Sequence, residues 1–279
     1  MVSDHETDAA SDPIGGMMYA TPSMGGTVLL WAISLSAFAG YGEIVIADDA
    51  SAWQACGFAV SPPDGSDADA DTSFPRPYEG GLSSVGGVRL QLLGAGRTRG
   101  ALSWSWHREG EPKVVLVDGI PTALTATEPA PDPAPHPNGA SRLYSITLAT
   151  SHLERTKAAL EAAGAPLRRV LDPAPFSKQV SMALFSLGPT LIEVIAPREP
   201  GETVELPGLP PLDLRLDAPA KIVGVVPEVP DLAPLQSLLG DKLGTPRPAM
   251  QGEGRQIATV RHEKVGLSLT MAFLTSKST

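Results

Sequence analysis

The chain has 279 residues, 42% of them hydrophobic, and a formal net charge of −10, a balance typical of a globular protein with a sizeable core. The acidic balance argues against a nucleic-acid partner, because binding to phosphate backbones depends on clustered Lys and Arg. Cys56 is the only cysteine in the sequence, so an intrachain disulfide and a thiolate metal cluster are excluded, and a reducing compartment fits.

The N-terminal part of the sequence is acidic and then apolar. We expect residues 1–25 to form a disordered or loose tail, and the acidic, breaker-rich residues 61–80 to pack loosely as well. The apolar stretch at 26–40 is shorter than the roughly 20 residues of a bilayer-spanning helix, so it is expected to be core. The acidic segment before it does not fit a secretory or transit leader. We therefore expect a cytoplasmic protein without a membrane partner, with organelle import left open.

Breaker-rich stretches divide the remaining sequence into three blocks, and the middle block has the clearest pattern. Its "LYSITLAT" at 143–150 has strand composition, and "SHLERTKAALEAAG" at 151–164 is typical of a helix. Ser151 is the expected N-cap, with Glu154 completing a capping box. "KQVSMALFSLG" and "TLIEVIAP" follow as a hairpin. This order predicts a βαβ-type module.

The other two blocks repeat this order. In the first, a strand, a helix and a strand are expected at 42–48, 49–58 and 85–94; in the third, the corresponding segments are 220–229, 230–244, 255–266 and 267–275. One such module cannot bury the face of its sheet alone, so we expect the modules to pair.

The middle block resembles a known family. "RLYSITLATSHLERTKAALEAAG" followed by "MALFSLGPTLIEVIAP" is similar to a module of the vicinal oxygen chelate superfamily, the glyoxalase, bleomycin resistance protein and extradiol dioxygenase group. The resemblance is good over 136–275 and weaker over 41–94. It implies an α+β fold in which paired βαβββ modules form mixed sheets curled round a cleft. The implied domains are a partial glyoxalase-like region at 26–126, a Pro-rich linker at 127–140 and a domain of paired modules at 141–275.

The resemblance also implies positions for metal ligands. In that superfamily each module supplies two ligands, commonly His on its first strand and Glu on its last. Carried over, Glu193 falls at the closing glutamate of the middle block, and Ser145 replaces the first-strand histidine. Glu43 and Gln91 fall at the same two positions of the first block. The spacing is 48 residues in both blocks, which supports the alignment.

Two pairings of the modules are open. If the first and middle modules pair, the site holds an oxygen-only set that suits a hard ion such as Mg, Mn or Ca rather than zinc, made of Glu43, Gln91, Ser145 and Glu193. If the middle and third modules pair, the third contributes Ile222 or Gly224 and Thr270, and only Glu193 ligates strongly. Short connections favour this second pairing, with the first block completed by "ALSWSWHRE" and "PKVVLVDGI".

Two functions follow from the resemblance. The first is a metal-dependent lyase, isomerase or dioxygenase for a small oxygenated molecule, with Glu193 as the catalytic residue and a weakly held divalent metal, Mg, Mn or Fe. The alternative is a metal-free protein of the bleomycin resistance type that binds a small molecule. A purely structural role for Glu193, as a buried carboxylate held by hydrogen bonds or by an Arg, is also open. In either case the sequence predicts no tight zinc site and no glyoxalase I activity, and a homodimer is compatible with it.

Overall fold

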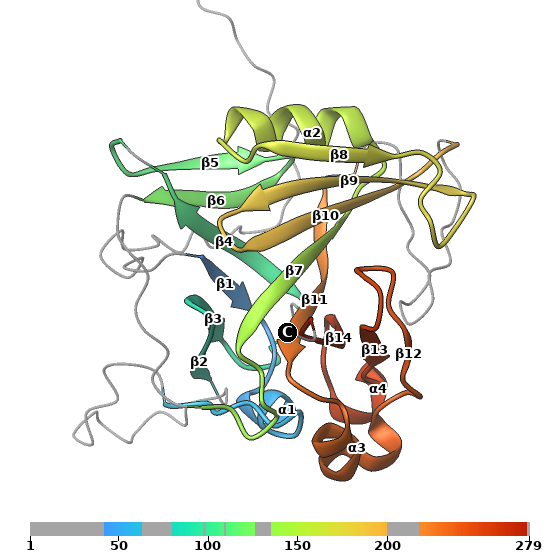
Figure 1. Ribbon diagram of the computed structural model, residues 1–279. Helices are drawn as coiled ribbons and strands as arrows, with labels where there is room; N and C mark the ends of the chain where they lie inside the picture. Colours follow the sequence, from blue (N-terminus) through green and yellow to red (C-terminus); the bar gives the residue numbers. More distant parts are fainter. Residues whose placement is uncertain are drawn as a thin grey trace, which may run out of the picture. The chain divides into compact units, whose positions relative to one another are not determined.

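The computed structural model describes residues 42–62, 80–96, 99–108, 110–125, 135–199 and 218–277, all within one compact unit, Leu35–Thr279. These residues form two mixed β-sheets with short helices between the strands (Figure 1). The expected α+β class is thereby confirmed. No helix in these ranges is long and apolar enough to cross a membrane.

Several expectations fall on other parts of the chain. The loose tail at 1–25 and the apolar stretch at 26–40 lie outside the described residues, as do most of the segments at 61–80 and 127–140. The domain boundaries drawn from the sequence therefore stay predictions.

The first sheet, called here the N-terminal sheet, has the strand order β2-β3-β1-β4-β6-β5. Strand β1 runs parallel to β3, antiparallel to β4, and β4 runs parallel to β6. Two half-sheets of the same design thus meet at β1 and β4. The elements are β1 (Glu43–Ile46), α1 (Ala50–Gln54), β2 (Gly81–Val85), β3 (Val88–Leu92), β4 (Ala101–His107), β5 (Lys113–Val117) and β6 (Ile120–Thr125).

The second sheet, called here the C-terminal sheet, repeats that design with the order β12-β13-β14-β11-β7-β10-β9-β8. Strand β7 is parallel to β10, β11 is parallel to β14, and β7 and β11 pair antiparallel in the middle. The elements are β7 (Arg142–Ala149), α2 (Leu153–Ala162), β8 (Leu167–Leu171), β9 (Val180–Leu187), β10 (Thr190–Pro197), β11 (Lys221–Val229), α3 (Ala233–Leu239), the 3-10 turn η2 (Gly240–Lys242), β12 (Arg247–Pro248), β13 (Gln256–Thr259), α4 (His262–Val265) and β14 (Thr270–Thr275).

Strand register supports the alignment of the first and middle blocks. Glu43 lies beside Arg89 in the β1–β3 pair, and Ser145 lies beside Leu191 in the β7–β10 pair. The sequence separation is the same in the two pairs, so equivalent positions meet in equivalent places. The β7–β11 pairing shows that the middle block joins the third, as short connections favour. The first block is completed by β4 and β5, from the two stretches expected to do so, and by β6, which follows the second of them.

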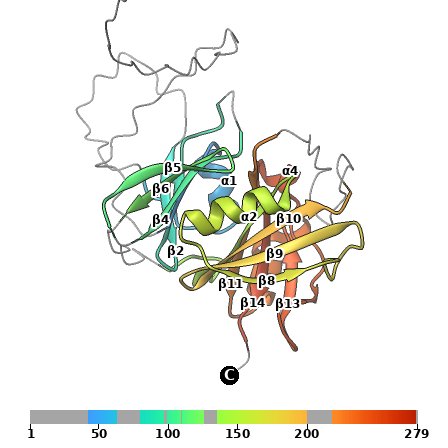
Figure 2. The same ribbon diagram turned by 90° about the horizontal axis from the view of Figure 1, so that it is seen from above.

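One hydrophobic core joins the two sheets. Its largest fully buried side chains come from both, and include Trp53, Trp104, Trp106, Phe185 and Phe273. The indole N–H of Trp106 on β4 donates to the carbonyl oxygen of Ala163, at the end of α2, over 3.3 Å. Helix α2 packs against β5 of the N-terminal sheet as well as β9 and β10 of its own sheet (Figure 2). Helix α2 therefore packs against both sheets.

The expected cap of α2 is wrong. The helix begins at Leu153, its N-cap is His152, and no side chain of the cap residue bonds to the helix. Instead Asp118, in the tight turn between β5 and β6, accepts hydrogen bonds from the Thr150 and Thr156 hydroxyls. It also pairs with Arg155, with Nε and Oδ1 2.6 Å apart. An acid near a helix N-terminus is favourable, so Asp118 from the other sheet adds to the charge of Glu154, which lies in the first turn of the helix.

Candidate ligand-binding cleft

The C-terminal sheet bends round a cavity of about 380 Å³. Residues of β8 and β12 both line this cavity, although these strands are at opposite ends of the sheet. The sheet must therefore curl far enough to bring its two edges to one space, as the resemblance implies. A volume of this size is in the range of sites for small organic ligands.

The floor of the cavity is a row of four neighbouring strand positions. Glu193 on β10 lies beside Thr147 on β7, Thr147 beside Gly224 on β11, and Gly224 beside Thr270 on β14. The side chains of Glu193, Thr147 and Thr270 line the cavity. A Cβ atom at Gly224 would be 3.6 Å from the Cβ atoms of both threonines, so this position faces the same side. Each of the two modules thus contributes two positions to the floor.

Glu193 is the acid of this floor. Together with Leu191 it lines the cavity, whereas Val194 packs in the core, as the alternation of side chains along a strand requires. Burial raises the pKa of the Glu193 carboxyl to about 7, and the neighbouring Ser145 hydroxyl partly offsets the rise. A large share of the carboxyl is therefore protonated at neutral pH, and Glu193 can donate a hydrogen bond or exchange a proton.

A β-bulge places Tyr144 among the residues that line the cavity. Opposite β11, Leu143 pairs with Pro227 and Ser145 with Val226, so Tyr144 is an extra residue without a partner of its own. Such a bulge re-aims side chains. Ser145 is fully buried and is not among the lining residues, whereas Tyr144 is. The Ser145 hydroxyl still lies beside the Glu193 carboxyl, so Ser145 stays next to the floor row although it does not reach the cavity.

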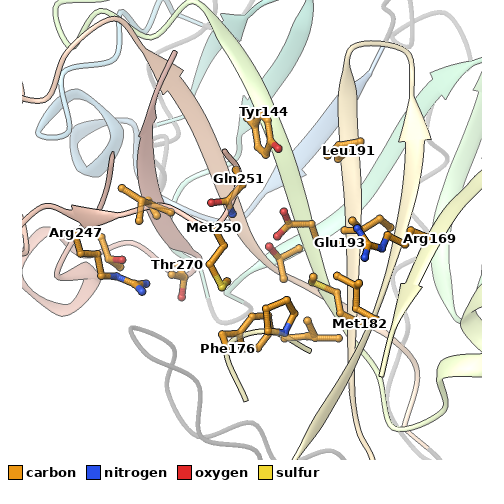
Figure 3. Close-up of a pocket in the computed structure, with 18 residues that line it drawn as sticks. Tyr144, Arg169, Phe176, Met182, Leu191, Glu193, Arg247, Met250, Gln251 and Thr270 are labelled. Atoms are coloured by element: carbon orange, nitrogen blue, oxygen red, sulfur yellow. The ribbon is translucent and has the colours of Figure 1, made fainter. Parts of the chain in front are cut away.

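Charged side chains hold Tyr144 in place. The guanidinium carbons of Arg142 and Arg255 are 5.5 Å and 4.9 Å from the centre of the Tyr144 ring. Both arginines bind the Glu228 carboxylate, Arg142 through two bonds of 3.0 and 2.9 Å and Arg255 through its Nη2. Burial, and next the charge of Glu193, raise the pKa of Tyr144, so its hydroxyl stays protonated. Figure 3 shows that hydroxyl on the side of the ring toward Glu193.

Sequence reasoning missed Tyr144. Simple alternation along the strand puts Tyr144 on the face opposite to Thr147, and nothing in "RLYSITLAT" indicates the bulge that changes this. A partial signal was available in the paired strand, since the Pro227 nitrogen in "VVPEV" has no hydrogen to donate to a ladder, and proline inside a strand marks an edge or a bulge.

The four ligand positions drawn from the resemblance are divided between the sheets. Glu43 and Gln91 lie on β1 and β3 of the N-terminal sheet, while Ser145 and Glu193 lie on β7 and β10. Glu43 lines a second, very small cavity, with residues of β4, β7, β9 and β10. The structure therefore does not bring these four residues together, and the pairing on which that metal set depended is not the one adopted.

The donors present do not fit a divalent metal. The floor row offers one carboxylate and two neutral threonine hydroxyls, and its fourth position is a glycine without a side chain. Nowhere in the described ranges do three His, Cys, Asp or Glu side chains gather closely enough to hold an ion. Because protein metal sites rely on several imidazole, thiolate or carboxylate donors, this cleft lacks the set that the resemblance implies.

Glu43 is the second acid with an altered pKa. Its side chain is 2% exposed, and one of its carboxyl oxygens, Oε2, has no hydrogen-bond partner among the described residues. Burial raises its pKa to about 7, and the charge of Arg89 partly offsets the rise. The adjoining cavity of about 10 Å³ has room for about one water molecule, so Glu43 has no access to an organic ligand.

Comparison with solved structures identifies the fold. A mutant of 4-hydroxymandelate synthase from Streptomyces coelicolor shares 13% identity, with 86% of this chain and 92% of that chain covered and a TM-score of 0.53. A xylose isomerase-like TIM barrel/4-hydroxyphenylpyruvate dioxygenase fusion protein gives 11% identity, with 86% and 49% covered and a TM-score of 0.53. The chain has the vicinal oxygen chelate fold.

Methylmalonyl-CoA epimerase from Mycobacterium tuberculosis shares 14% identity over 50% of this chain and 91% of its own, with a TM-score of 0.37. No family model matches the chain, and no curated protein matches it. At these identities the solved structures show the vicinal oxygen chelate fold alone, and function has to be argued from the site.

Proposed function

We propose that this chain binds a small organic molecule in the cavity of the C-terminal sheet without a metal ion. The observation that carries the proposal is the floor row, in which Glu193 is the one strong metal ligand of four positions. A ligand bound there would meet hydrogen-bonding groups instead of an ion: the Glu193 carboxyl, the Tyr144 hydroxyl and the hydroxyls of Thr147 and Thr270.

The rest of the cavity wall supports a ligand with an apolar body. It is built largely from aliphatic, aromatic and thioether side chains, among them Leu171, Phe176, Met182, Leu184, Ile195 and Met250. Apolar walls with a few convergent polar groups are the usual composition of small-molecule sites. The thioether side chains of Met182 and Met250 also adapt to ligands of varied outline.

A second candidate function is a metal-free lyase or isomerase in which Glu193 transfers a proton. One observation favours it: a carboxyl with a pKa of about 7 lines an open cavity together with Tyr144, whose pKa its charge raises. A general acid or base works best when its pKa is close to the operating pH. Glu193 would take a proton from the bound molecule, and Tyr144 would donate a hydrogen bond to the oxygen on which charge develops.

Calorimetric titration with Mg, Mn, Fe(II) and Zn tests the metal-free proposal. We expect no stoichiometric binding by the wild-type protein and the same result for Glu193→Gln. A stoichiometric site that disappears in Glu193→Gln would contradict the proposal and restore the metal-dependent alternative. For the second candidate, a bound ligand should exchange an acidic C–H proton with deuterated solvent in the wild-type protein and lose that exchange in Glu193→Gln.

A further inference from the structure

Two arginines face the cavity from opposite edges of the C-terminal sheet. Arg169 lies on β8 and Arg247 on β12, and both line the cavity with exposed side chains. Figure 3 shows them on opposite sides of the Glu193 carboxyl. Their exposure places the two guanidinium groups at the mouth of the cavity, with Glu193 and Tyr144 further inside.

Among the described residues, neither arginine has a partner that neutralises its charge. No ion pair and no side-chain hydrogen bond joins Arg169 or Arg247 to another residue in the part of the chain that the structure describes. Arginines elsewhere in the same sheet behave differently, because Arg142 and Arg255 bind Glu228 and Arg198 binds Asp172. The two unpaired guanidinium groups therefore converge on one cavity with their hydrogen-bonding capacity unused.

The charge around the cavity is opposite to that of the whole chain. The chain carries a net charge of −10, whereas the cavity lining contains two arginines and one carboxylic acid, Glu193. Burial favours the neutral form of that acid. A cleft lined by charge of one sign attracts ions of the other sign, so the mouth of this cavity favours anions against the background of an acidic protein.

We propose that the ligand is a small organic anion: an apolar body that fills the cavity, with a carboxylate or phosphate group that Arg169 and Arg247 bind at the mouth. Planar guanidinium groups match the oxygens of carboxylates and phosphates through paired hydrogen bonds. This inference rests on the proposed binding function and adds the chemical class of the ligand to it.

A matched pair of fluorescent probes separates the anion from its apolar body. 1-Anilinonaphthalene-8-sulfonate carries a sulfonate in place of the carboxylate or phosphate, and N-phenyl-1-naphthylamine is the same aromatic body without it. We expect the wild-type protein to bind the anionic probe at least about tenfold more tightly, the effect of one or two charge-assisted hydrogen bonds. The double variant Arg169→Gln/Arg247→Gln should remove that preference and leave the affinity for the neutral probe unchanged.

The double variant Arg168→Gln/Arg261→Gln is the control, because it removes the same net charge from positions that do not line the cavity. Arg168 is next to Arg169 on β8 and binds the Ser186 hydroxyl instead. This control should bind both probes as the wild-type protein does. Competition by 1-naphthoate and by 1-naphthyl phosphate then distinguishes a carboxylate site from a phosphate site.

Two results would overturn the inference, and they differ. Equal affinity for the two probes, or an anion preference that survives Arg169→Gln/Arg247→Gln, would refute the anionic ligand and leave the small-molecule cavity standing. If neither probe binds, and neither 1-naphthoate nor its neutral amide binds, the proposed binding function fails together with the inference.

Discussion

The two sheets have the same strand design, yet their acids have different surroundings. In the C-terminal sheet Glu193 lines a cavity of about 380 Å³, and in the N-terminal sheet Glu43 adjoins one of about 10 Å³. Burial raises the pKa of both carboxyls to about 7. The same shift should have different consequences, because only Glu193 can meet a ligand. Glu43 should affect stability alone.

Positions that are equivalent in the two sheets also carry different chemistry. Gln91 and Val45 are neighbours on β3 and β1, where the C-terminal sheet has Glu193 and Thr147. The shared register fixes where a side chain is presented, and the residue present decides what it can do there. The comparison therefore predicts that replacing Glu43 in the N-terminal sheet changes the stability of the protein, whereas replacing Glu193 in the C-terminal sheet changes its affinity for a ligand.

The largest expected effect is a loss of stability in the C-terminal sheet on replacing Glu228 by Gln. Although burial alone would raise the pKa of Glu228, bonds and charge from Arg142 and Arg255 hold it below its ordinary value. The variant leaves Arg255, which is 3% exposed, without its carboxylate. We expect the free energy of unfolding to fall by about 3 kcal/mol in urea titrations.

The matched control for Glu228 is Glu154→Gln, which removes an acid from an exposed pair with Lys157 on α2. Exposed pairs contribute little, so that variant should lose less than about 0.5 kcal/mol. If the free energy of unfolding falls by similar amounts in the two variants, the ion pairs of Glu228 with Arg142 and Arg255 do not stabilise the protein.

The next largest effect is a dependence of stability on pH, caused by Glu43. Between the ordinary pKa of 4.5 and the folded-state value of about 7, the folded protein holds a proton that the unfolded chain has lost. Stability should therefore fall as pH rises through this window, and the cost is complete above it. Glu43→Gln should be more stable than the wild-type protein by about 3 kcal/mol at pH 8 and nearly equal to it at pH 4. Thermal unfolding across this range measures the difference.

Glu193 should show its titration in ligand affinity. As its carboxyl ionises, it adds a negative charge to a cavity whose other titratable and charged groups are Tyr144, Arg169 and Arg247. We expect the affinity for an anionic probe to fall about fivefold as pH rises through about 7, the effect of one like charge in a partly solvated site. Glu193→Gln should make that affinity independent of pH. A flat profile in Glu43→Gln instead would contradict the comparison.

The smallest expected effect is that of Tyr144→Phe. The variant keeps the ring between Arg142 and Arg255 and removes only the hydroxyl. We expect a loss of about threefold in ligand affinity, the contribution of one weak hydrogen bond, with unchanged stability. Binding and thermal unfolding measured side by side test this; unchanged affinity with lower stability would give Tyr144 a structural role only.

The sequence predicts the modules and their alignment well, because both depend on local patterns. Apolar strands, the helix at 151–164 and equal spacing are visible in the residues themselves, and strand alternation is enough to orient Glu193. Two features depend on contacts between distant segments. The bulge that turns Tyr144 into the cavity forms only when β7 pairs with β11. Asp118, which binds side chains at the start of α2, belongs to the other sheet, so no capping motif in the helix could reveal it.

The two arginines illustrate the same limit. Arg169 and Arg247 are far apart in the sequence, and in the flat order of strands they belong to opposite edges of the sheet. Only the curvature of the sheet brings them to one cavity. Their shared role is therefore a property of tertiary structure, and residue patterns around either position do not indicate it.

Binding of 1-anilinonaphthalene-8-sulfonate to protein stripped of metals by a chelator tests the central claim most directly. Fluorescence titrations would be run on the stripped protein and again after addition of Mg, Mn or Fe(II). Because we propose that side chains of the cavity bind the probe without a metal ion, we expect the same affinity with and without added metal. The affinity should be lower in Arg169→Gln/Arg247→Gln. Binding that appears only after a metal is restored, and that Glu193→Gln abolishes, would contradict the account.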